Sequence, residues 1–368
     1  MAFTFSEEHA ALRAAVAEFL ADHSDEAAVR ALAETGRGMD PKVWRALAEQ
    51  LGAVGLAVPE QYGGSGAGPV ELAVVAEQLG RALFCGPYLS SAVFASTLLV
   101  ELADDSANRD LLPALAGGER TATVALDEGT GDWDPASSST AAERGADGWT
   151  VSGEKRYVLD GAHADTLLVV TQGARVFAVD RTAPGVTTTP LATLDGTRKL
   201  ADVSLRNAPA RPLAPDGDHG RAVRRALDTT AVMLAAEQAG GARAALDMAV
   251  EYAKQRYQFG RPIGSFQAVK HMCAELLVDV ESAYSAAYYA AWALADSADN
   301  AEEATSLAAA FCSDAFVRAA SDNIQIHGGI GFTWEHPAHL YLRRARGGAR
   351  LLGSANTHRE RYLREVTA

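Results

Sequence analysis

The spacing of hydrophobic residues changes twice along the chain, and this change constrains the fold more than any other feature of the sequence. From about residue 6 to about residue 115, hydrophobic side chains recur every three or four positions, as in amphipathic helices. From about residue 121 they alternate in short segments typical of strands, and from about residue 220 long Ala-rich helical segments follow. Few architectures place a small β-unit between two helical units, so the pattern predicts a three-part, mainly helical fold.

The predicted elements follow this division. Helices are expected near 6–20, 44–54, 69–83, 88–115, 227–246, 268–295 and 302–327, the last three forming a bundle. Strands of a small antiparallel barrel or sandwich are expected at 121–126, 150–158, 166–171, 176–179, 186–189 and 199–205, and a linker is expected at 208–218. The predicted domains are an N-terminal helical domain at 1–118, a middle β-domain at 119–210 and a C-terminal helical bundle domain at 211–368.

Composition narrows the classes of function. The 368 residues include 33 basic and 47 acidic side chains, which give a net charge of -14. This acidic surplus argues against nucleic acid or an anionic membrane surface as the partner, because both bind basic surfaces. No hydrophobic run approaches the ~20 residues of a membrane span, and the first residues lack a basic, hydrophobic signal segment, so we expect a cytoplasmic protein without membrane insertion. Three widely spaced cysteines argue against a disulfide framework or a zinc site.

The segment 252–267 interrupts the helical pattern of the C-terminal part. Its first residues have helical spacing, Gly260 and Pro262 then break the helix, and helical spacing resumes after them. Such a break exposes backbone N–H groups, and Arg256 adds a cationic fork beside them. The segment therefore suits a diphosphate, although an ordinary helix–turn–helix with a surface arginine has the same pattern.

A second cluster, 325–332, places three glycines at the expected end of a helix. Gly328, Gly329 and Gly331 permit close approach of a ligand to the backbone, or they form a helix cap. By itself this cluster does not distinguish the two.

Taken together and in this order, the two segments resemble the C-terminal signature of the flavin-dependent acyl-CoA dehydrogenase family. They match Arg-x-Gln-Phe-Gly-Arg-Pro-Ile-x-x-Phe-Gln from Arg256 and Gln-Ile-x-Gly-Gly-x-Gly-Phe from Gln325. The helix–β–helix order agrees with that family along the whole chain. The resemblance implies the acyl-CoA dehydrogenase fold, with a small central β-domain and a C-terminal four-helix bundle. It also implies FAD held across a subunit interface, an acyl-CoA substrate and an electron-transfer acceptor protein.

The residues of the signature carry over as contacts to FAD. The resemblance implies that the diphosphate and adenosine half of FAD is contacted by Arg256, Gln258, Phe259, Gln325, Ile326 and Gly329. In this family those contacts come from the neighbouring subunit. A basic run follows, comprising Arg343, Arg344, Arg346 and Arg350, and both a ligand role and a solvated helix face are open for it.

Both positions that carry the catalytic base in this family are altered. The family removes the α-proton of an acyl thioester with a carboxylate while a hydride leaves the β-carbon for the flavin. Its common base is the Glu of a Tyr-Glu-Gly-Thr turn, which matches Leu351–Ser354 and places Leu352 at the base. Its alternative base lies in a Leu-Asp-x-Glu-Arg pattern, which matches Leu227–Ala231 and places Thr230 there. Neither Leu352 nor Thr230 takes a proton, so the resemblance implies no catalytic residue at either position.

The middle domain also departs from the family. The flavin-facing loop Thr-Glu-Pro-Gly-x-Gly-Ser-Asp is replaced by Asp127–Asp132, and the Trp-Ile-Thr that packs on the flavin is replaced by Tyr157–Leu159. Tyr157 can still stack on the flavin ring, whereas Leu159 has no group to donate a hydrogen bond to it. Other titratable groups near the inferred pocket, each more typical of a loop or surface residue or a cap, are Asp127, Asp160, Asp228 and His358.

Three hypotheses of function remain open. In the first, the chain is the subunit without the base in a hetero-oligomer with a base-bearing acyl-CoA dehydrogenase subunit. Segments 329–336 and 339–345 resemble the actinobacterial heteromeric branch that shortens steroid side chains. In the second, the chain is a homo-oligomeric flavoenzyme of altered chemistry. In the third, it is a binding or scaffold protein that lost FAD, and the retained Arg256, Gln258 and Gln325 argue against this hypothesis.

Overall fold

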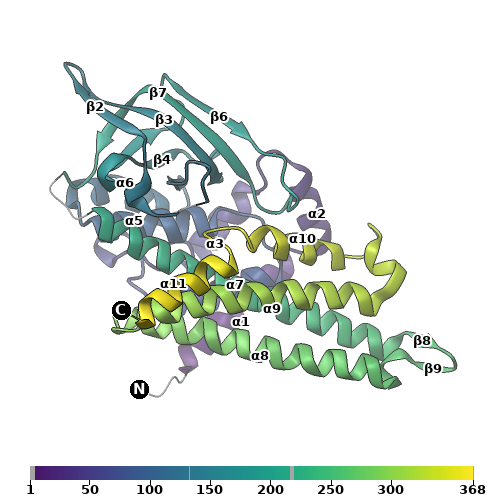
Figure 1. The fold of residues 1–368 in the computed structure, drawn as a ribbon. Helices are drawn as coiled ribbons and strands as arrows, with labels where there is room; N and C mark the ends of the chain where they lie inside the picture. Colours follow the sequence, from purple (N-terminus) through teal and green to yellow (C-terminus); the bar gives the residue numbers. More distant parts are fainter. Residues whose placement is uncertain (1–4, 132, 216–218, 368) are drawn as a thin grey trace. The chain divides into compact units, whose positions relative to one another are not determined.

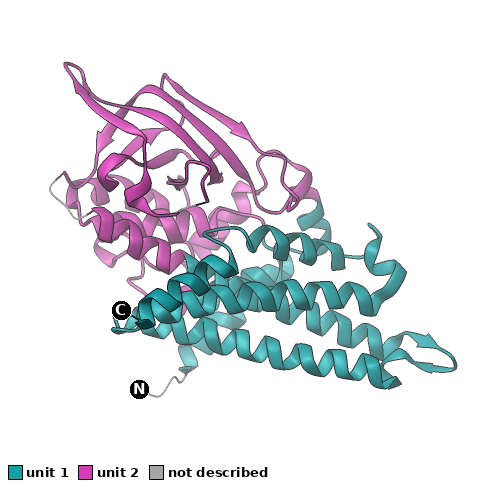
Figure 2. Ribbon diagram, in the orientation of Figure 1, with its two compact units in different colours: residues 1–30, 73–84, 231–368 teal, residues 31–72, 85–230 magenta. Residues whose placement is uncertain are grey.

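The computed structural model describes residues 5–131, 133–215 and 219–367. Contacts divide the chain into two compact units, which Figure 2 shows in different colours. Unit 1 comprises Met1–Arg30, Ala73–Phe84 and Ala231–Ala368, and unit 2 comprises Ala31–Leu72 and Cys85–Thr230. Both units are discontinuous in sequence, so each is held together by contacts between distant segments.

Unit 1 is a helical bundle (Figure 1). It contains α1 (Glu7–His23), α7 (His219–Gln255) from Ala231 onward, α8 (Gln267–Ala295), α9 (Ala301–His327), α10 (Ala338–Gly348) and α11 (Ala355–Thr367), with parts of α2 (Glu26–Glu34) and α4 (Pro69–Arg81). The three predicted long helices are confirmed, and α7 is longer at both ends than the hydrophobic spacing indicated. Ser6 caps α1, because its Oγ accepts a hydrogen bond from the backbone N–H of His9 (3.2 Å). Within the described ranges, none of the helices combines the length and hydrophobicity that crossing a membrane requires.

Small residues set the distance between helices of unit 1. Buried alanines of α7 and α9 form much of the bundle core. Where α4 crosses α7, a Cβ on Gly80 would lie 1.9 Å from the carbonyl O of Glu237, and a Cβ on Gly240 would lie 1.9 Å from the carbonyl O of Glu77. The two backbones therefore touch, and only glycine fits at either position.

Apart from parts of α2, α4 and α7, the last up to Thr230, the helices of unit 2 come from the part of the chain before the sheet. They are α3 (Pro41–Leu51), η2 (Tyr88–Ala95), α5 (Ser96–Leu102) and α6 (Asp105–Ala116), with short 3-10 turns at η1 (Glu60–Tyr62), η3 (Pro135–Ser137) and η4 (Gln172–Ala174). The single helix predicted for 88–115 is therefore three elements. η2 winds as a π-helix, and Ala103, with a φ of +54°, ends α5 before Asp104 caps α6.

The sheet of unit 2 has seven strands in the order β1-β4-β5-β7-β3-β2, with β6 paired to β7. Their bounds are β1 (Ala122–Ala125), β2 (Ala141–Gly145), β3 (Gly148–Leu159), β4 (Thr166–Val170), β5 (Val176–Asp180), β6 (Val186–Pro190) and β7 (Leu200–Pro212). The expectation of a wholly antiparallel sheet is wrong at one pair, because β1 and β4 run parallel with Ala122 opposite Thr166. The chain between them forms β2 and β3 before it returns, which is the kind of crossover that a parallel pair needs.

Two further differences from the predicted strands concern β2 and β7. The sequence analysis did not predict β2. The linker predicted from residue 208 is wrong up to Pro212, because β7 continues through both prolines and pairs Pro209 with Thr150 of β3. Long-range pairing thus overrides the local proline signal. Residues 216–218 of the predicted linker lie outside the described residues.

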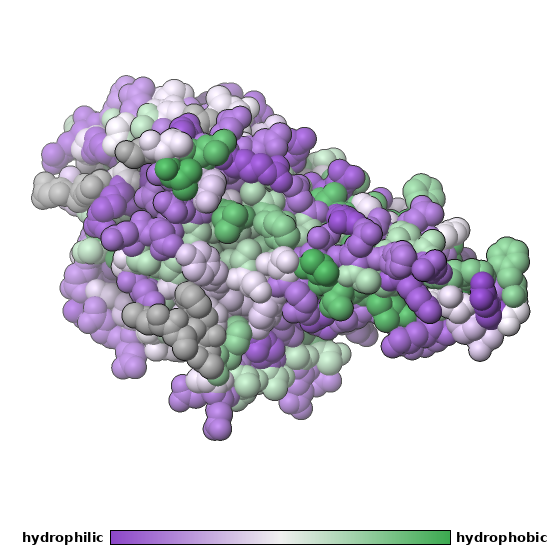
Figure 3. Space-filling view, turned by 60° about the horizontal axis from the view of Figure 1, so that its bottom comes forward, coloured by the Kyte–Doolittle hydropathy of each residue, from purple (hydrophilic) through white to green (hydrophobic). Residues whose placement is uncertain are grey.

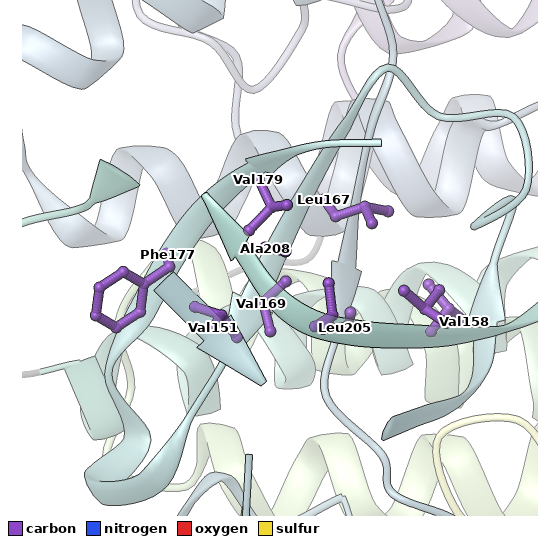
Figure 4. Close-up of a cluster of buried hydrophobic side chains, with 10 residues drawn as sticks. Val151, Val158, Leu167, Val169, Phe177, Val179, Leu205 and Ala208 are labelled. Atoms are coloured by element: carbon purple, nitrogen blue, oxygen red, sulfur yellow. The ribbon is translucent and has the colours of Figure 1, made fainter. Parts of the chain in front are cut away.

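The core of the sheet is made of alternate residues of five strands. Its buried members are Ala125, Val151, Val158, Leu167, Val169, Phe177, Val179, Val203, Leu205 and Ala208. Figure 4 shows these side chains gathered between the strands. The other positions of β1 and β4 are buried as well, whereas β2 and β6 have exposed positions that can meet solvent or other groups.

Candidate functional site

The break predicted within 252–267 is a small hairpin between α7 and α8. β8 (Tyr257–Gln258) pairs with β9 (Arg261–Pro262), and the 3-10 turn η5 (Ile263–Ser265) leads into α8. Phe259 lies in the turn with a φ of +53°, which is unusual for a bulky residue. Figure 1 shows the hairpin extending beyond the ends of the two helices. The predicted helix break is confirmed.

The side chains of this hairpin are exposed. Arg256, Gln258 and Phe259 all face away from the bundle, and Phe259 is 90% exposed. In the described part of the chain, no carboxylate lies within ion-pair distance of the Arg256 guanidinium, although Lys254 pairs weakly with Glu251 (3.9 Å). An exposed aromatic ring beside an unpaired arginine is typical of a surface that a ligand or a second chain covers.

The second segment lies at the end of α9. Gln325 is exposed, Ile326 is buried, and the 3-10 segment η6 (Gly328–Phe332) follows. Gly328 has a φ of +63°, and a Cβ added to Gly328 or Gly329 would meet no atom within 4 Å. The backbone of η6 is therefore open on one side, and a ligand has room to approach it.

The bundle brings the two segments to the same end of unit 1. Ile326 at the end of α9 packs with Ala253 near the end of α7 and with Ile263 after the hairpin. Exposed hydrophobic side chains from the hairpin, η6 and the following loop accompany them, namely Tyr257, Phe259, Ile330, Phe332 and Trp334. Figure 3 shows hydrophobic residues exposed among hydrophilic ones on the molecular surface.

This set of groups suits FAD. Arg256 supplies a positive charge that no described carboxylate neutralises, Gln258 and Gln325 have free amide donors, and the open glycine backbone of η6 admits a bulky ligand. A diphosphate needs such charge-assisted and amide donors, and flat rings pack on exposed aromatic side chains. The residues present therefore fit the cofactor that the family resemblance implies.

Tyr157 of β3 is also placed unusually. β3 and β7 shift register between Lys155 and Val158, so Tyr157 lies in a β-bulge with a φ of +53° and is 47% exposed. A bulge aims a side chain out of the regular alternation, and bulges with a strained residue occur often at functional sites. Leu159 is buried in the structure.

The loop that replaces the family's flavin-facing loop is anchored by a buried ion pair. Lys155 is 0% exposed, and its Nζ donates to Glu128 Oε1 (2.7 Å), the carbonyl O of Leu126 (3.0 Å) and Ser138 Oγ (3.0 Å). Burial raises the pKa of Glu128, but hydrogen bonds from Lys155, Ser139 and Thr140 outweigh it and hold that pKa well below its ordinary value. Asp132, at the end of the predicted loop, lies outside the described residues.

Sequence reasoning did not predict a role for Lys155. The alternation of β3 carried the signal, because Lys155 lies an even number of residues from the buried Val151 and so faces the same side of the strand. A lysine on an inward position needs a buried partner.

Neither base position holds a group that titrates in the required range. Leu352 is 5% exposed and has a φ of +59°, a left-handed conformation that favours glycine. It lines a cavity of about 10 Å³ together with His358 and Ser313. Thr230 is fully buried in unit 2, and its hydroxyl donates to the carbonyl O of Ala226 (2.6 Å). A cavity of this size holds at most a water molecule.

The alternative titratable groups are also occupied or buried. Asp160 accepts a hydrogen bond from Ser90 Oγ (2.6 Å), and Asp228 is buried. One carboxylate oxygen of Asp127 accepts from the backbone N–H groups of Gly129 and Gly131. Burial lowers the pKa of His358 to about 4, with a further contribution from Arg361. Asp127, Asp228 and His358 are buried, and Asp160 is half-buried.

The arginines of the basic run have different roles; Arg343, Arg344 and Arg346 lie on α10, and Arg350 lies just after it. Arg344 is buried, forms an ion pair with Glu237 (3.4 Å) and donates to the carbonyl O of Phe84 (2.7 Å), so it holds α10 to its neighbours. The guanidinium of Arg343 lies 4.7 Å from the ring centre of Trp334. Arg346 and Arg350 are exposed.

Comparisons with known proteins identify the family. The family models described as the N-terminal, middle and C-terminal domains of acyl-CoA dehydrogenase match residues 6–119, 123–208 and 218–367. The acyl-CoA dehydrogenase IpdE2 of Mycobacterium tuberculosis is 38% identical over 362 residues, which cover 98% of each chain. The chain therefore belongs to the acyl-CoA dehydrogenase family, and the predicted fold and resemblance are confirmed.

Two solved structures are similar along almost their whole length. One is the ChsE4–ChsE5 complex from Mycobacterium tuberculosis, with 30% identity, a TM-score of 0.90 and coverage of 100% of this chain and 99% of that one. The other is a variant of the Tcur3481–Tcur3483 steroid ACAD, with 31% identity, a TM-score of 0.88 and coverage of 98% of each chain. Membership of this family of oxidoreductases implies FAD as the cofactor.

Proposed function

We propose that this chain is the subunit without a catalytic base in a heteromeric, FAD-dependent acyl-CoA dehydrogenase that acts on a steroid or lipid acyl-CoA. One contrast carries the proposal. At the position of the family's base stands the buried Leu352, whereas the signature residues Arg256, Gln258 and Phe259 are kept and exposed. A chain that had lost FAD binding together with the catalytic base would have no reason to keep an arginine without a described carboxylate partner beside a phenylalanine that is 90% exposed.

The relatives support a divided assembly and a steroid substrate. The ChsE4–ChsE5 structure is that of a complex of two different proteins, and the Tcur3481–Tcur3483 protein is described as a steroid ACAD. We infer that this chain likewise pairs with a base-bearing acyl-CoA dehydrogenase subunit and acts on a substrate of that class. Reoxidation of the reduced cofactor then requires an electron-transfer acceptor protein.

In this proposal the chain's own residues bind and orient the cofactor. FAD, when bound, supplies the two-electron acceptor of the reaction. Arg256 neutralises its diphosphate through charge-assisted hydrogen bonds, each of about 1.5–3 kcal/mol. Gln258 and Gln325 donate to the same half without adding charge, and Phe259 excludes water from it. The open backbone of Gly329 admits the ligand.

Stacking on the flavin ring and removal of the α-proton are assigned to separate groups of the two chains. Tyr157, aimed outward by the bulge of β3, is the residue of this chain that would stack on a flavin bound at its own middle domain, a position that stays empty when each pair of different chains holds one FAD. The partner subunit contributes the carboxylate that takes the α-proton of the thioester. Leu352 and Thr230 leave this chain without a proton acceptor at either base position.

The experiment compares FAD affinity in two variants of the same charge change. Arg256→Ala, purified with its partner subunit and stripped of flavin, is expected to bind FAD ~10-fold or more weakly than wild type. Lys254→Ala lies two residues earlier and is exposed, so it is expected to change the dissociation constant less than about two-fold. An Arg256→Ala complex with the wild-type dissociation constant would exclude this arrangement.

A further inference from the structure

His327, at the end of α9, lies in a stack of three rings. Its ring centre is 4.2 Å from that of Tyr252 on α7, with an interplanar angle of 28°. It is also 4.2 Å from the ring centre of His336, at an interplanar angle of 44°, and His336 lies in the loop between η6 and α10. The side chain of His327 is buried. The stack therefore ties α9 to α7 and to the loop that follows η6.

The last turn of α9, including the Cβ of His327, forms the closed side of the glycine segment η6, and the ring of His336 adjoins the loop that follows it. A Cβ on Gly331 would lie 2.8 Å from the Cβ of His327 and 3.0 Å from the carbonyl O of Ile324. On Gly328 and Gly329, by contrast, an added Cβ would meet nothing within 4 Å. The segment thus has one face open to a ligand and one face pressed against His327, so the position of this histidine decides where the open face lies.

The hydrogen bonds of the two histidines fix their neutral forms. His327 Nδ1 lies 2.8 Å from the carbonyl O of Asn323, so this nitrogen carries the proton and donates. The Nε2 of His327 is buried and has no hydrogen-bond partner in the described chain. His336 Nδ1 accepts from the backbone N–H of Ala338 (3.2 Å), so its proton is on Nε2. A second proton on His327 would add a buried N–H that has no acceptor.

We infer that His327, whose ring packs against Tyr252 and His336, is a positioning residue: its uncharged ring holds the loop after η6, and with it η6, in the shape that binds FAD, and charging the rings loosens η6 and weakens FAD binding. This inference rests on the proposed function, since it assigns η6 to the FAD site. The consequence is a binding affinity that falls in acid, although no group that contacts FAD titrates there.

The surrounding charges agree with this direction. Burial lowers the pKa of His327, and the hydrogen bond to Asn323 offsets this only in part. Burial, His327 and Arg30 also lower the pKa of His336, against the opposite effect of Glu26. Glu26 already forms an ion pair with Arg30 (2.7 Å), so its carboxylate does little to stabilise a protonated His336.

The third histidine of this region, His339 on α10, behaves in the same way. Burial, Arg30 and Arg343 lower its pKa. The charged groups near the three histidines therefore include Arg30, Arg343 and the carboxylate of Glu26, which is paired with Arg30. All three rings are held neutral near pH ~7 and charge only on acidification.

The first test follows amide exchange of the chain without flavin. Hydrogen exchange of the η6 amides, corrected for the intrinsic rate, is measured at about pH 7.5 and about pH 5.5. Wild type is expected to lose protection in η6 on acidification by ~3-fold or more. His327→Phe keeps the stack and cannot be protonated, so its protection should not change with pH. His327→Ala should be unprotected at both pH values.

The second test titrates FAD into the flavin-free assembly that holds it. The wild-type dissociation constant is expected to rise ~3-fold or more between about pH 7.5 and about pH 5.5. His327→Phe should abolish this rise. His336→Phe is a second variant, chosen because its position is more exposed and so less critical for folding, and it should reduce the rise. The matched control His271→Phe, on the exposed face of α8, should retain the wild-type pH dependence.

The outcomes separate this inference from the proposed function. If His327→Phe and His336→Phe both keep the wild-type pH dependence, or if wild type has none, the positioning role is refuted while FAD binding stands. If no assembly of the wild-type chain holds FAD, the proposed function fails. The exchange experiment then decides by itself whether His327 fixes η6.

Discussion

The buried ion pair beneath the loop of unit 2 gives a prediction whose magnitude follows from the structure. Glu128→Gln keeps the shape of the side chain and removes its charge. Lys155 then retains only neutral acceptors, although it is 0% exposed. In addition, one side of the new amide carries donors where Glu128 Oε2 accepted from the backbone N–H and the hydroxyl of Ser139. Removing one partner of a fully buried pair costs about 3–5 kcal/mol, and because the Glu128 side chain is 17% exposed we expect a loss near the lower end of this range.

The assay is urea unfolding of Glu128→Gln and wild type near pH ~7, with amide exchange of β3 to locate the loss. The matched control is Glu154→Gln on the same strand, whose carboxylate is exposed and accepts from Ser204 Oγ (2.7 Å). The control is expected to lose less than about 1 kcal/mol. If both variants lose the same small free energy, the ion pair does not anchor the loop and the reasoning is wrong.

The same pair predicts a pH dependence of stability. The pKa of Glu128 is lower in the folded protein than in the unfolded chain, where it is about 4.3. Its contribution to the free energy of unfolding is therefore complete above about pH 4.3 and is lost as the pH falls toward the folded pKa. The difference in stability between wild type and Glu128→Gln should accordingly shrink between about pH 6 and about pH 3. A constant difference over this range would contradict the assignment.

Two more predictions concern the helical bundle and the base position. Gly240→Ala drives a methyl group into the carbonyl O of Glu77, so urea unfolding should show a free energy of unfolding lower by about 1–3 kcal/mol or more. The control Gly36→Ala, which has open space around it, should leave that free energy nearly unchanged. Leu352→Glu restores the family's carboxylate at the base position. A dye-linked assay with acyl-CoA should nevertheless find less than full activity in the isolated chain, because Leu159 still has no group to donate a hydrogen bond to the flavin. Turnover at ordinary flavoenzyme rates would refute this.

The sequence predicted those parts of the fold that depend on local spacing. The period of three to four marked α7, α8 and α9, and the change to a period of two marked six of the seven strands of unit 2. The helix break near Gly260 and Pro262 was also local, since glycine disfavours a helix and proline interrupts one. Local signals failed at β2 and at Pro209, where pairing with β3 decides the conformation.

The residues of the candidate site were likewise predictable from the sequence, whereas their arrangement in space was not. The signature residues Arg256 and Gln325 were found because their order along the chain resembles a known family. Their proximity at one end of the bundle depends on the packing of Ile326 between distant helices. The stack of His327 with Tyr252 joins residues 75 positions apart in sequence, and no spacing rule predicts it.

The central claim is that FAD is shared with a base-bearing partner, and the FAD content of the purified assembly tests it most directly. The flavin absorption and the protein concentration are measured for the chain alone and for its complex with the partner. We expect the chain alone to be colourless or nearly so, and the complex to hold one FAD for each pair of different chains. A yellow homo-oligomer with one FAD per chain that oxidises acyl-CoA by itself would contradict the account.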